Sequence, residues 1–279
     1  MMPHAEQKPV VYLSGIFDDM RTPVIRFLQE AARLGNVHAL LYSDALAQHI
    51  SGERTNFPQA ERKYFLENIR FVNQVSLIDN GDADALPAPC LGCDHNEIIW
   101  AVREGEANPN KAAFCADSGI TYAVIPDADL AGFPLEEPED DPSRKKVMVS
   151  GCFDWVHSGH VRFFEEAAEY GDLYVVVGHD DNLRLLKGEG HPLFPQEERQ
   201  YWVHAIRFVH RAPISTGHGW LDSEPEVRRY KPDSFLVNHD GDKPEKRRFF
   251  SDMGINYIVL ERKPKQGLKA RESTQLRGF

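Results

Sequence analysis

The sequence predicts an α/β protein made of two tandem Rossmann-like domains, each built on a parallel sheet. Short apolar, β-branched runs alternate with helical patterns along the chain, which is typical of a parallel α/β sheet. Three blocks of sequence also occur twice in the same order. The paired blocks are residues 11–37 and 147–173, those that begin at Phe57 and Phe194, and those that begin at Asp117 and Asp252. Such ordered matches are hard to obtain by chance, so we expect a duplicated domain.

The boundary between the two copies is expected in an acidic, proline-containing run at residues 135–146. Such a run predicts a solvated linker. We therefore expect one domain over residues 1–138 and a second over residues 145–279.

The elements are clearest in the second copy. Residues 147–151 (VMVSG) predict a buried strand, and residues 160–170 place apolar side chains on one helical face before Gly171 ends the helix. The later expected elements are a strand at 173–180, a helix at 196–209, a strand at 234–238, a helix at 244–253 and a strand at 256–260. Parallel sheets bind ligands beyond the carboxyl ends of their strands, so we expect the function at the first strand-to-helix turn.

Composition excludes several classes of protein. With 32 Lys+Arg against 43 Asp+Glu, the 279-residue chain has a formal net charge of -11, whereas a general nucleic-acid binder is basic. No apolar run is long enough for a membrane span, and the first residues lack the layout of a signal peptide. We expect a cytoplasmic protein.

Four cysteines are too few and too unevenly spaced for a disulfide framework. A zinc site could be assembled from Cys90, Cys93, His95 and Cys115, but only Cys90 and Cys93 have the spacing typical of zinc ligands. Unligated thiols are the favoured interpretation.

The second copy carries its chemistry in the segment GCFDWVHSGH, residues 151–160. His157 and His160 flank the place where the first strand turns into the first helix. A helix N-terminus offers free N–H groups and a positive dipole end, and Gly159 leaves room for a phosphate to approach. A capping serine beside two incidental histidines is the alternative interpretation.

This segment is followed by LKGEGHPLFPQEER and IRFV, and the set resembles the cytidylyltransferase family, whose members activate glycerol phosphate, ethanolamine phosphate and choline phosphate with CTP. The resemblance covers most of residues 147–274. It implies an enzyme, a nucleotidyltransferase that joins CMP to a small phosphorylated or phosphonate-bearing alcohol and releases pyrophosphate, with Mg²⁺ as cofactor. The implied partners are CTP and that anionic alcohol, with neither nucleic acid nor a membrane span.

The resemblance also implies roles for individual residues. The implied catalytic residues are His157, His160, Lys187 and Arg271. The implied nucleotide-binding residues are Gly151, Cys152, Phe153, Asp154, Gly159, Arg199, Arg207, Ser273 and Thr274, and the implied substrate-binding residues are Trp220, Asp240 and Lys187. Asp154 is also the candidate metal ligand. The chain's end departs from the family pattern, so either Arg262 or Arg271 supplies the family's arginine, and we favour Arg271 because it precedes the two hydroxyls closely.

Positive charge is concentrated where this chemistry needs it. Residues 261–279 hold six cations and two acids, which suits a triphosphate and a second anion, although a solvated basic tail is the alternative. Because the attacking oxygen is already anionic, positioning and charge stabilisation are enough for catalysis. Two other functions stay open: an ATP-dependent adenylyltransferase of a sugar phosphate, and a non-catalytic nucleotide sensor.

The first copy lacks the signature. Arg21, Thr22, Pro23 and Val24 stand at the positions of residues 157–160, and proline removes an N–H where an anion needs one. Arg62 and Arg70 persist, so weak nucleotide binding stays an alternative to a structural role. Since family members commonly dimerise near the signature helix, we expect the tandem copies to form a pseudo-dimer, with a homodimer as a further possibility.

Overall fold

The computed structural model describes residues 8–91 and 97–271. The chain divides into two compact units, Met1–Gly132 and Phe133–Phe279, which are described separately below as the N-terminal and C-terminal units. Ser273, Thr274, Cys93 and His95 lie outside the described residues.

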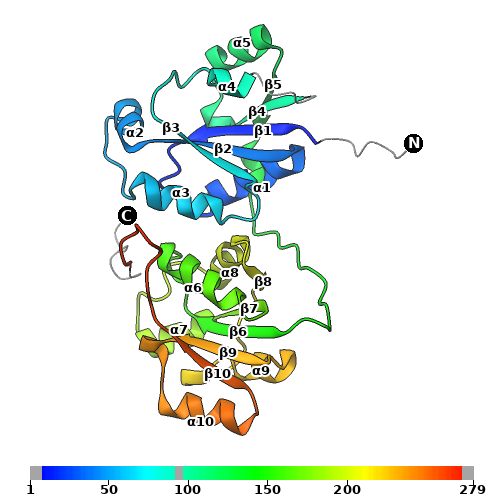
Figure 1. Cartoon of the computed structure of the whole chain (residues 1–279), viewed down its shortest axis with the longest axis vertical. Helices are drawn as coiled ribbons and strands as arrows, with labels where there is room; N and C mark the ends of the chain where they lie inside the picture. The colour runs from blue at the N-terminus through cyan, green and yellow to red at the C-terminus, as the bar shows by residue number, and fades with distance from the viewer. Residues whose placement is uncertain (1–7, 92–96, 272–279) are drawn as a thin grey trace, which may run out of the picture. The chain divides into compact units, whose positions relative to one another are not determined.

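The N-terminal unit is a five-stranded parallel sheet with strand order β3-β2-β1-β4-β5. Helices cover both faces of this sheet (Figure 1). Its elements are β1 (Val10–Gly15), α1 (Thr22–Leu34), β2 (Asn36–Tyr42), α2 (Asp44–Ser51), α3 (Gln59–Glu67), β3 (Gln74–Ile78), α4 (Ala88–Leu91), β4 (Ile98–Arg103), the 3₁₀ turn η1 (Glu104–Glu106), α5 (Pro109–Ser118), β5 (Thr121–Ile125) and the 3₁₀ turn η2 (Asp127–Leu130).

The C-terminal unit has a second five-stranded parallel sheet, with strand order β10-β9-β6-β7-β8. Counted from the first strand of each unit, the order is the same in both. The elements are β6 (Lys146–Gly151), α6 (Ser158–Ala168), β7 (Asp172–Val177), α7 (Asp180–Lys187), α8 (Gln196–Ala205), β8 (Val209–Arg211), η3 (Gly219–Leu221), α9 (Glu224–Tyr230), β9 (Ser234–Asn238), η4 (His239–Gly241), α10 (Pro244–Asp252) and β10 (Asn256–Leu260).

The predicted α/β fold with two parallel sheets is confirmed. The first strand and first helix of the C-terminal unit lie where the sequence predicts them, with Val161, Phe164 and Ala167 fully buried at helical spacing. The expected helix over 196–209 is shorter, since α8 ends at Ala205 and β8 begins at Val209. The sequence interpretation missed the short elements α7, β8 and α9.

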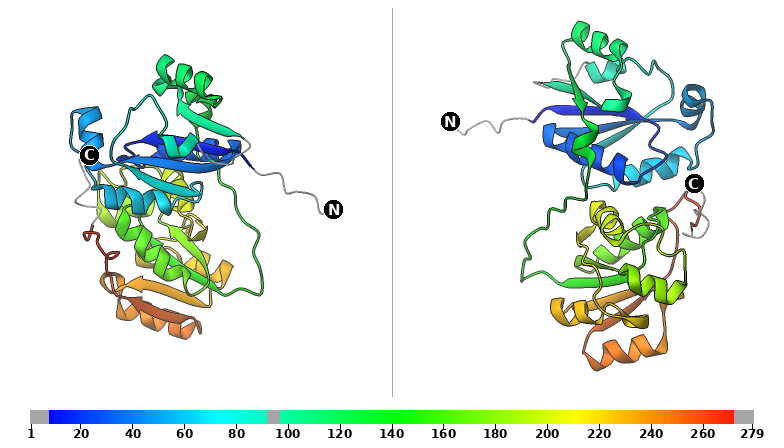
Figure 2. Two further views of the ribbon diagram at one scale, coloured as in Figure 1. Left: turned by 45° about the horizontal axis from the view of Figure 1, so that its top comes forward. Right: turned by 180° about the vertical axis from the view of Figure 1, so that it is seen from behind.

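Burial on both faces of each sheet stabilises the fold. Val147, Met148 and Val149 of β6 are all fully buried, so this central strand is covered on both sides, as parallel strands usually are. On one face Met148 packs with Phe235 of β9 and Phe250 of α10 in a hydrophobic cluster. Each such side chain contributes about 1.5–3 kcal/mol through burial. The views in Figure 2 show helices on either side of each sheet.

The acidic run before β6 is exposed, as expected of a linker, but the C-terminal unit holds part of it. The carboxylate of Asp140 accepts hydrogen bonds from the Tyr174 hydroxyl (2.6 Å), Arg211 Nε (2.9 Å) and Lys146 Nζ (3.1 Å). These donors, the tyrosine hydroxyl first, hold the pKa of Asp140 well below its usual range. The segment is therefore anchored to the second sheet.

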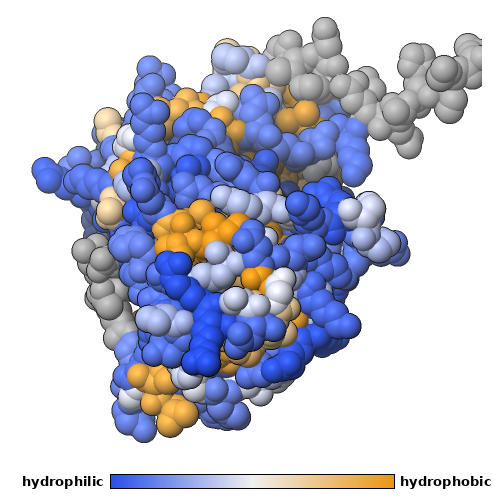
Figure 3. All heavy atoms as spheres, turned by 60° about the horizontal axis from the view of Figure 1, so that its bottom comes forward, coloured by the Kyte–Doolittle hydropathy of each residue, from blue (hydrophilic) through white to orange (hydrophobic). Residues whose placement is uncertain are grey.

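No helix within residues 8–91 and 97–271 has the length and apolar character needed to cross a membrane. Hydrophilic side chains prevail on the face shown in Figure 3, and hydrophobic ones form small separate patches there.

Candidate active site at the carboxyl ends of β6 and β9

The C-terminal sheet has a topological switch point between β6 and β9. β6 pairs with β7 on one side and with β9 on the other, so the connections leave in opposite directions and open a crevice at the carboxyl ends of the strands. A cavity of about 560 Å³ lies at this place. Its described walls come from the β6–α6 turn, the α7–α8 loop, the β9–α10 segment and the chain that follows β10.

The β6–α6 turn depends on two special backbone positions. A Cβ at Gly151 would lie 2.8 Å from the ring of Phe153, so only glycine fits there. Phe153 has φ of 51°, a left-handed conformation that costs about 1–3 kcal/mol in a side chain of this size and that persists where the surrounding structure enforces it. Phe17 has the same φ of 51° at the matching turn of the N-terminal unit. The turn is therefore a property of the fold that both units share.

His157 caps the N-terminus of α6. Its Nδ1 accepts a hydrogen bond from the backbone N–H of Gly159 (3.1 Å), so in the neutral ring the proton is on Nε2. A Cβ at Gly159 would lie 2.9 Å from Cε1 of this ring. Glycine at this position therefore lets the imidazole lie against the first turn of the helix.

The two histidines form a close pair that lines the cavity. The ring centroids of His157 and His160 are 4.0 Å apart. Nε2 of His157 and Nδ1 of His160 are buried, and neither has a hydrogen-bond partner within the described part of the chain. Because buried polar groups are normally hydrogen-bonded, these atoms indicate a ligand site, in which the Nε2–H of His157 donates to an acceptor oxygen.

Both histidines are neutral at physiological pH. Burial lowers the pKa of His157 far below its usual range, and the charges of His160, Arg262 and Arg271 add to this effect. Burial, followed by the positive charges of Arg262 and Lys187, lowers the pKa of His160 to about 3. The pair therefore contributes N–H dipoles, while nearby lysine and arginine side chains contribute the positive charge.

Those cations come from two segments. Lys187, the last residue of α7, is exposed and lines the cavity. Arg262 follows β10, and its Nη1 donates to Oδ2 of Asp240 (2.7 Å) while its Nη2 donates to the carbonyl of Arg271 (3.2 Å). That carbonyl is 3.5 Å from the Cβ position of Gly159. The chain after β10 therefore passes beside the start of α6.

A second hollow of about 690 Å³ shares walls with the first. Lys187, Asp240 and Arg262 line both, whereas Lys263 and Arg271 line only the second. Arg262 and Arg271 both lie beside the predicted site, so they are not alternatives to each other.

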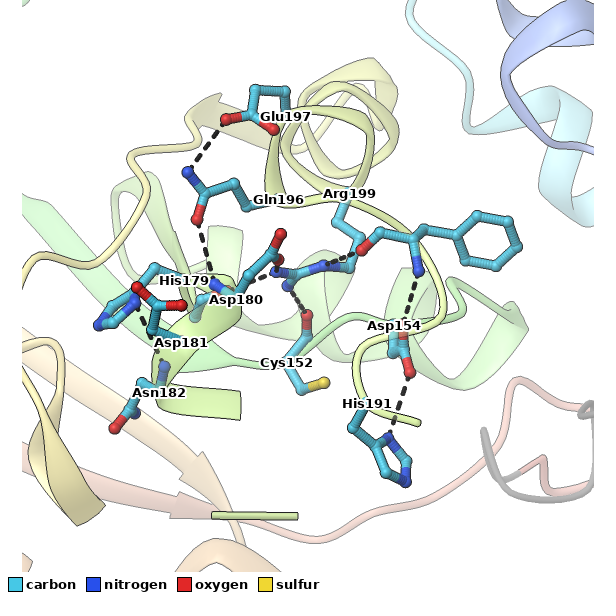
Figure 4. Close-up of polar contacts among 12 residues, drawn as sticks. Cys152, Asp154, His179, Asp180, Asp181, Asn182, His191, Gln196, Glu197 and Arg199 are labelled. Carbon is cyan, nitrogen blue, oxygen red and sulfur yellow. Dashed lines mark hydrogen bonds and ion pairs between the residues drawn. The ribbon is translucent and has the colours of Figure 1, made fainter. Parts of the chain in front are cut away.

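Arg199 lies outside the cavity although we expected it to bind nucleotide. It is fully buried, and its guanidinium donates to the carbonyls of Phe194 (3.0 Å), Gly178 (2.7 Å) and Cys152 and to Oδ1 of Asp180 (2.7 Å; Figure 4). With its donors occupied, it ties the β6–α6 turn to the end of β7 and to the α7–α8 loop. In this structure Arg199 therefore stabilises the fold.

Arg62 makes the same contacts in the N-terminal unit. It donates to the carbonyls of Phe57 (2.9 Å), Tyr42 (3.0 Å) and Ile16 and to Oδ1 of Asp44 (2.7 Å). The persistence of this arginine in a unit without the histidine signature is explained by this structural role.

Asp154 lines the cavity and also holds the loop before α8. Its Oδ1 accepts from the backbone N–H groups of Leu193 (2.7 Å) and Phe194 (3.3 Å), and its Oδ2 is 3.5 Å from Nδ1 of His191 (Figure 4). Asp18 accepts from Asn56 and Phe57 in the same way in the N-terminal unit. Part of the carboxylate of Asp154 is therefore committed to the fold.

Two other expected site residues do not reach the cavity. Arg207 is exposed beyond the end of α8, and Trp220 in η3 is 48% exposed. Neither belongs to the walls of the two hollows. Gly151, Cys152, Phe153 and Gly159 do line the cavity.

Within the described ranges, no group of three or more His, Cys, Asp or Glu side chains is arranged to hold a metal ion. Cys90, Cys115 and Cys152 are in no disulfide bond, and the first two are buried in the N-terminal unit.

Sequence reasoning missed two ionisable residues in the cavity wall, His191 and Lys246. His191 lies in the α7–α8 loop, and Lys246 is in the first turn of α10. The lysine had one available signal, since a cation is unfavourable in the first turn of a helix and its presence there requires a reason.

The start of α1 in the N-terminal unit differs from the start of α6 in its side chains. Arg21 precedes α1 and forms an ion pair with Asp19, and Pro23 occupies the first turn. Arg26 donates to the carbonyl of Asp129 in η2 (2.5 Å). The segment after β5 is therefore fastened onto α1.

A parallel sheet whose switch point carries a glycine-bearing helix start, two unsatisfied imidazoles and a rim of cations is the arrangement of a nucleotidyltransferase. Residues 148–266 match the model of the family described as Cytidylyltransferase-like. The chain belongs to this family, and the C-terminal unit carries its signature.

Similar proteins fall in the same group. The chain is 38% identical to the FAD synthase of Thermococcus kodakarensis over 103 residues, which are 37% of this chain and 67% of that protein. It is 36% identical to the FAD synthase of Pyrococcus horikoshii over 119 residues, 41% of this chain and 78% of that protein. It is 41% identical to the bifunctional protein HldE of Geobacter sulfurreducens over 78 residues, 28% of this chain and 16% of that protein.

Among solved structures, a lipopolysaccharide core biosynthesis protein from Thermoplasma volcanium is 24% identical, with a TM-score of 0.38, over 44% of this chain and 100% of its own.

Proposed function

We propose that the C-terminal unit transfers a nucleoside monophosphate from a nucleoside triphosphate to a phosphate or phosphonate oxygen of a small anionic acceptor. The observation that carries this proposal is the pair of buried, unsatisfied nitrogens on His157 and His160 at the start of α6. A phosphate chain supplies the acceptor oxygen that the Nε2–H of His157 lacks, and the rim of cations supplies the charge.

The reaction needs few residues. An acceptor oxygen forms a bond to the α-phosphorus, the bond from that phosphorus to the bridging oxygen breaks, and pyrophosphate leaves with the electron pair. Because the nucleophile is already an anion, no general base is required. His157 donates a hydrogen bond to the phosphates through Nε2, the ring of His160 packs beside it, and Lys187, Arg262 and Arg271 stabilise the charge that develops on the leaving group.

A magnesium ion fits this site only together with the nucleotide. Mg²⁺ in phosphoryl-transfer sites is commonly held by one or two carboxylates and the substrate phosphates. Asp154 lines the cavity and is the carboxylate we assign to it. When bound there, Mg²⁺ neutralises phosphate charge.

For the base, we propose CTP, with a phosphorylated or phosphonate-bearing alcohol as acceptor, on the resemblance of the residue 151–160 and 187–199 segments to cytidylyltransferases. ATP is the second candidate, and a specific observation favours it. Relatives with 36% and 38% identity are named FAD synthases, and FAD contains an adenylyl group. Base choice is therefore the first property to measure.

We assign the N-terminal unit a structural role and propose that it arose by duplication. The shared strand order, the shared φ of 51° in the turn and the matching arginine contacts support duplication. The replacement of His157, Gly159 and His160 by Arg21, Pro23 and Val24 supports the loss of catalysis there.

The test is pyrophosphate release by the purified full chain with Mg²⁺. CTP and ATP are crossed with ethanolamine phosphate, glycerol 3-phosphate, choline phosphate, heptose 1-phosphate and 2-hydroxyethylphosphonate. Turnover with one nucleotide fixes the base. Tight nucleotide binding by calorimetry with no release for any pair, while a mixture of cell metabolites also gives no release, would favour a nucleotide sensor.

A further inference from the structure

The 560 Å³ cavity, in which we place the reaction, has more cations than acids in its wall that are available to a bound acceptor. Among the described residues of the 560 Å³ cavity wall, the acids are Asp154 and Asp240, and each is engaged by the protein itself. Asp154 accepts two backbone N–H groups, and Asp240 accepts from Arg262 at 2.7 Å. A substrate ammonium would therefore compete with Arg262 for Asp240 and with the proposed magnesium ion for Asp154.

The two lysines of the same wall make few polar contacts with the protein. Lys246 donates to the carbonyl of Gly241 (3.1 Å), and an ammonium has three N–H donors. Lys187 has no hydrogen bond or ion pair to any described residue. Burial, followed by the charge of Lys243, lowers the pKa of Lys246, although the carboxylates of Asp222, Asp242 and Asp240 act in the opposite direction. An anion at this place would further offset the positive charge of Lys246.

The position of Lys246 is not explained by helix packing. It is the third residue of α10, where the helix dipole disfavours a cation. Lys111 is the third residue of α5 in the N-terminal unit, and there the ammonium lies 5.4 Å from the ring centroid of Trp100. At the matching place on β9, Phe235 is instead stacked on Phe250 at 4.1 Å. The same helix position thus holds a lysine against an aromatic ring in one unit and at a cavity in the other.

We propose that Lys246 determines the class of acceptor: it binds a second anionic group of the acceptor, apart from the phosphate that attacks, so that the substrate is a phosphorylated acid rather than an amino-alcohol phosphate. This inference rests on the proposed function for the identity of the pocket. An ammonium group in this cavity would face Lys187, Lys246 and Arg262. The two carboxylates of the described wall are those of Asp154, which we assign to the magnesium ion, and Asp240, which pairs with Arg262.

The test uses three probes of similar size. Glycerol 3-phosphate and 3-phosphoglycerate differ only in a hydroxymethyl group against a carboxylate, and ethanolamine phosphate carries an ammonium. Their dissociation constants are measured by calorimetry on the full chain, without and with a saturating non-hydrolysable nucleotide. We expect 3-phosphoglycerate to bind at least about 10-fold more tightly than the other two, as for a charge-assisted hydrogen bond.

Variants then assign the preference to one side chain. Lys246→Met should abolish the ratio between 3-phosphoglycerate and glycerol 3-phosphate, Lys246→Arg should restore most of it, and Lys246→Glu should move the preference toward ethanolamine phosphate. Lys243→Met is the matched control, because it removes the same charge at the exposed N-cap of α10 outside the cavity wall. Nucleotide affinity should stay unchanged in Lys246→Arg and Lys243→Met, and in Lys246→Met it should change less than the acceptor ratio does.

Each outcome bears on one proposal. Equal binding of the three probes, or a Lys246→Met variant that loses nucleotide affinity and keeps the acceptor ratio, overturns the role of Lys246. A clear preference for 3-phosphoglycerate without pyrophosphate release from any nucleotide leaves that role standing and overturns the proposed transfer reaction. Faster turnover of ethanolamine phosphate than of 3-phosphoglycerate supports the reaction and refutes the inferred acceptor class.

Discussion

Replacing Gly159 by alanine should separate catalysis from folding. The new Cβ would lie 2.9 Å from Cε1 and 3.0 Å from Nδ1 of His157, whereas unstrained carbon contacts are about 3.5–4.0 Å. The imidazole must therefore move by about 0.5–1 Å, which carries its Nε2 donor away from the phosphates. A misplacement of about 1 Å can cost about 10²-fold in rate, and that is the loss we expect in kcat/KM.

The stability of the same variant should change little, because two effects oppose each other. Moving the ring weakens the cap contact between His157 and the Gly159 N–H (3.1 Å), and loss of a cap costs about 1 kcal/mol. Alanine in place of glycine inside a helix returns about 0.5–1 kcal/mol. The melting temperature should therefore shift by only a few degrees.

The assay is pyrophosphate release with the best nucleotide and acceptor, together with thermal unfolding of the same preparations. Gly105→Ala is the control, since a Cβ there meets no atom within 4 Å. A Gly159→Ala enzyme within about threefold of the wild-type rate would refute the idea that the position of His157 governs catalysis.

Three further predictions follow. His160→Ala should lower kcat by at least about 10²-fold and Arg21→Ala should leave it nearly unchanged; equal losses in the same assay would mean that the N-terminal turn takes part. Burial holds the pKa of His160 at about 3 against an ordinary value of 6.5, and that of His157 is lowered too. Because the unfolded chain binds more protons than the folded one, the urea midpoint of the wild type should fall as pH drops below 6.5. The fall should be less steep in His160→Gln. If the midpoints of both proteins depend on pH with the same slope, a buried neutral imidazole at position 160 is excluded. Arg199→Lys should lower the free energy of unfolding by about 2–5 kcal/mol, and Arg62→Lys should do the same in the N-terminal unit; unchanged denaturant midpoints would contradict their structural role.

The sequence predicted the fold from its repeats and its strand–helix alternation, but it did not show the short elements. β8 has only three residues, Val209–Arg211, and follows α8 without a glycine or proline to mark the change. Helical spacing therefore continues through Arg207 in the sequence, although the helix ends at Ala205. Short elements of this kind are decided by packing on the sheet, which local patterns do not contain.

The candidate site was predictable where chemistry and backbone geometry coincide. His157, Gly159 and His160 occupy adjacent positions on one helix start, so their spacing alone places them together. Lys246 is far away in the sequence and reaches the cavity only because β9 lies next to β6 in the sheet. Neighbours of that kind depend on strand order, which spacing along the chain does not give.

Arg199 shows why residue type alone assigns roles poorly. An arginine side chain can bind backbone carbonyls or a phosphate, and only its surroundings in the fold determine which of these it does. The repeat held the missing signal, because Arg62 persists where Pro23 and Val24 have replaced the glycine and histidine of the signature. Residues kept only in the C-terminal unit are therefore the first candidates for its chemistry. By this criterion Lys187, whose counterpart is Ser51, belongs with the two histidines, and the exposed ammonium of Lys187 at the rim of both hollows agrees with that assignment.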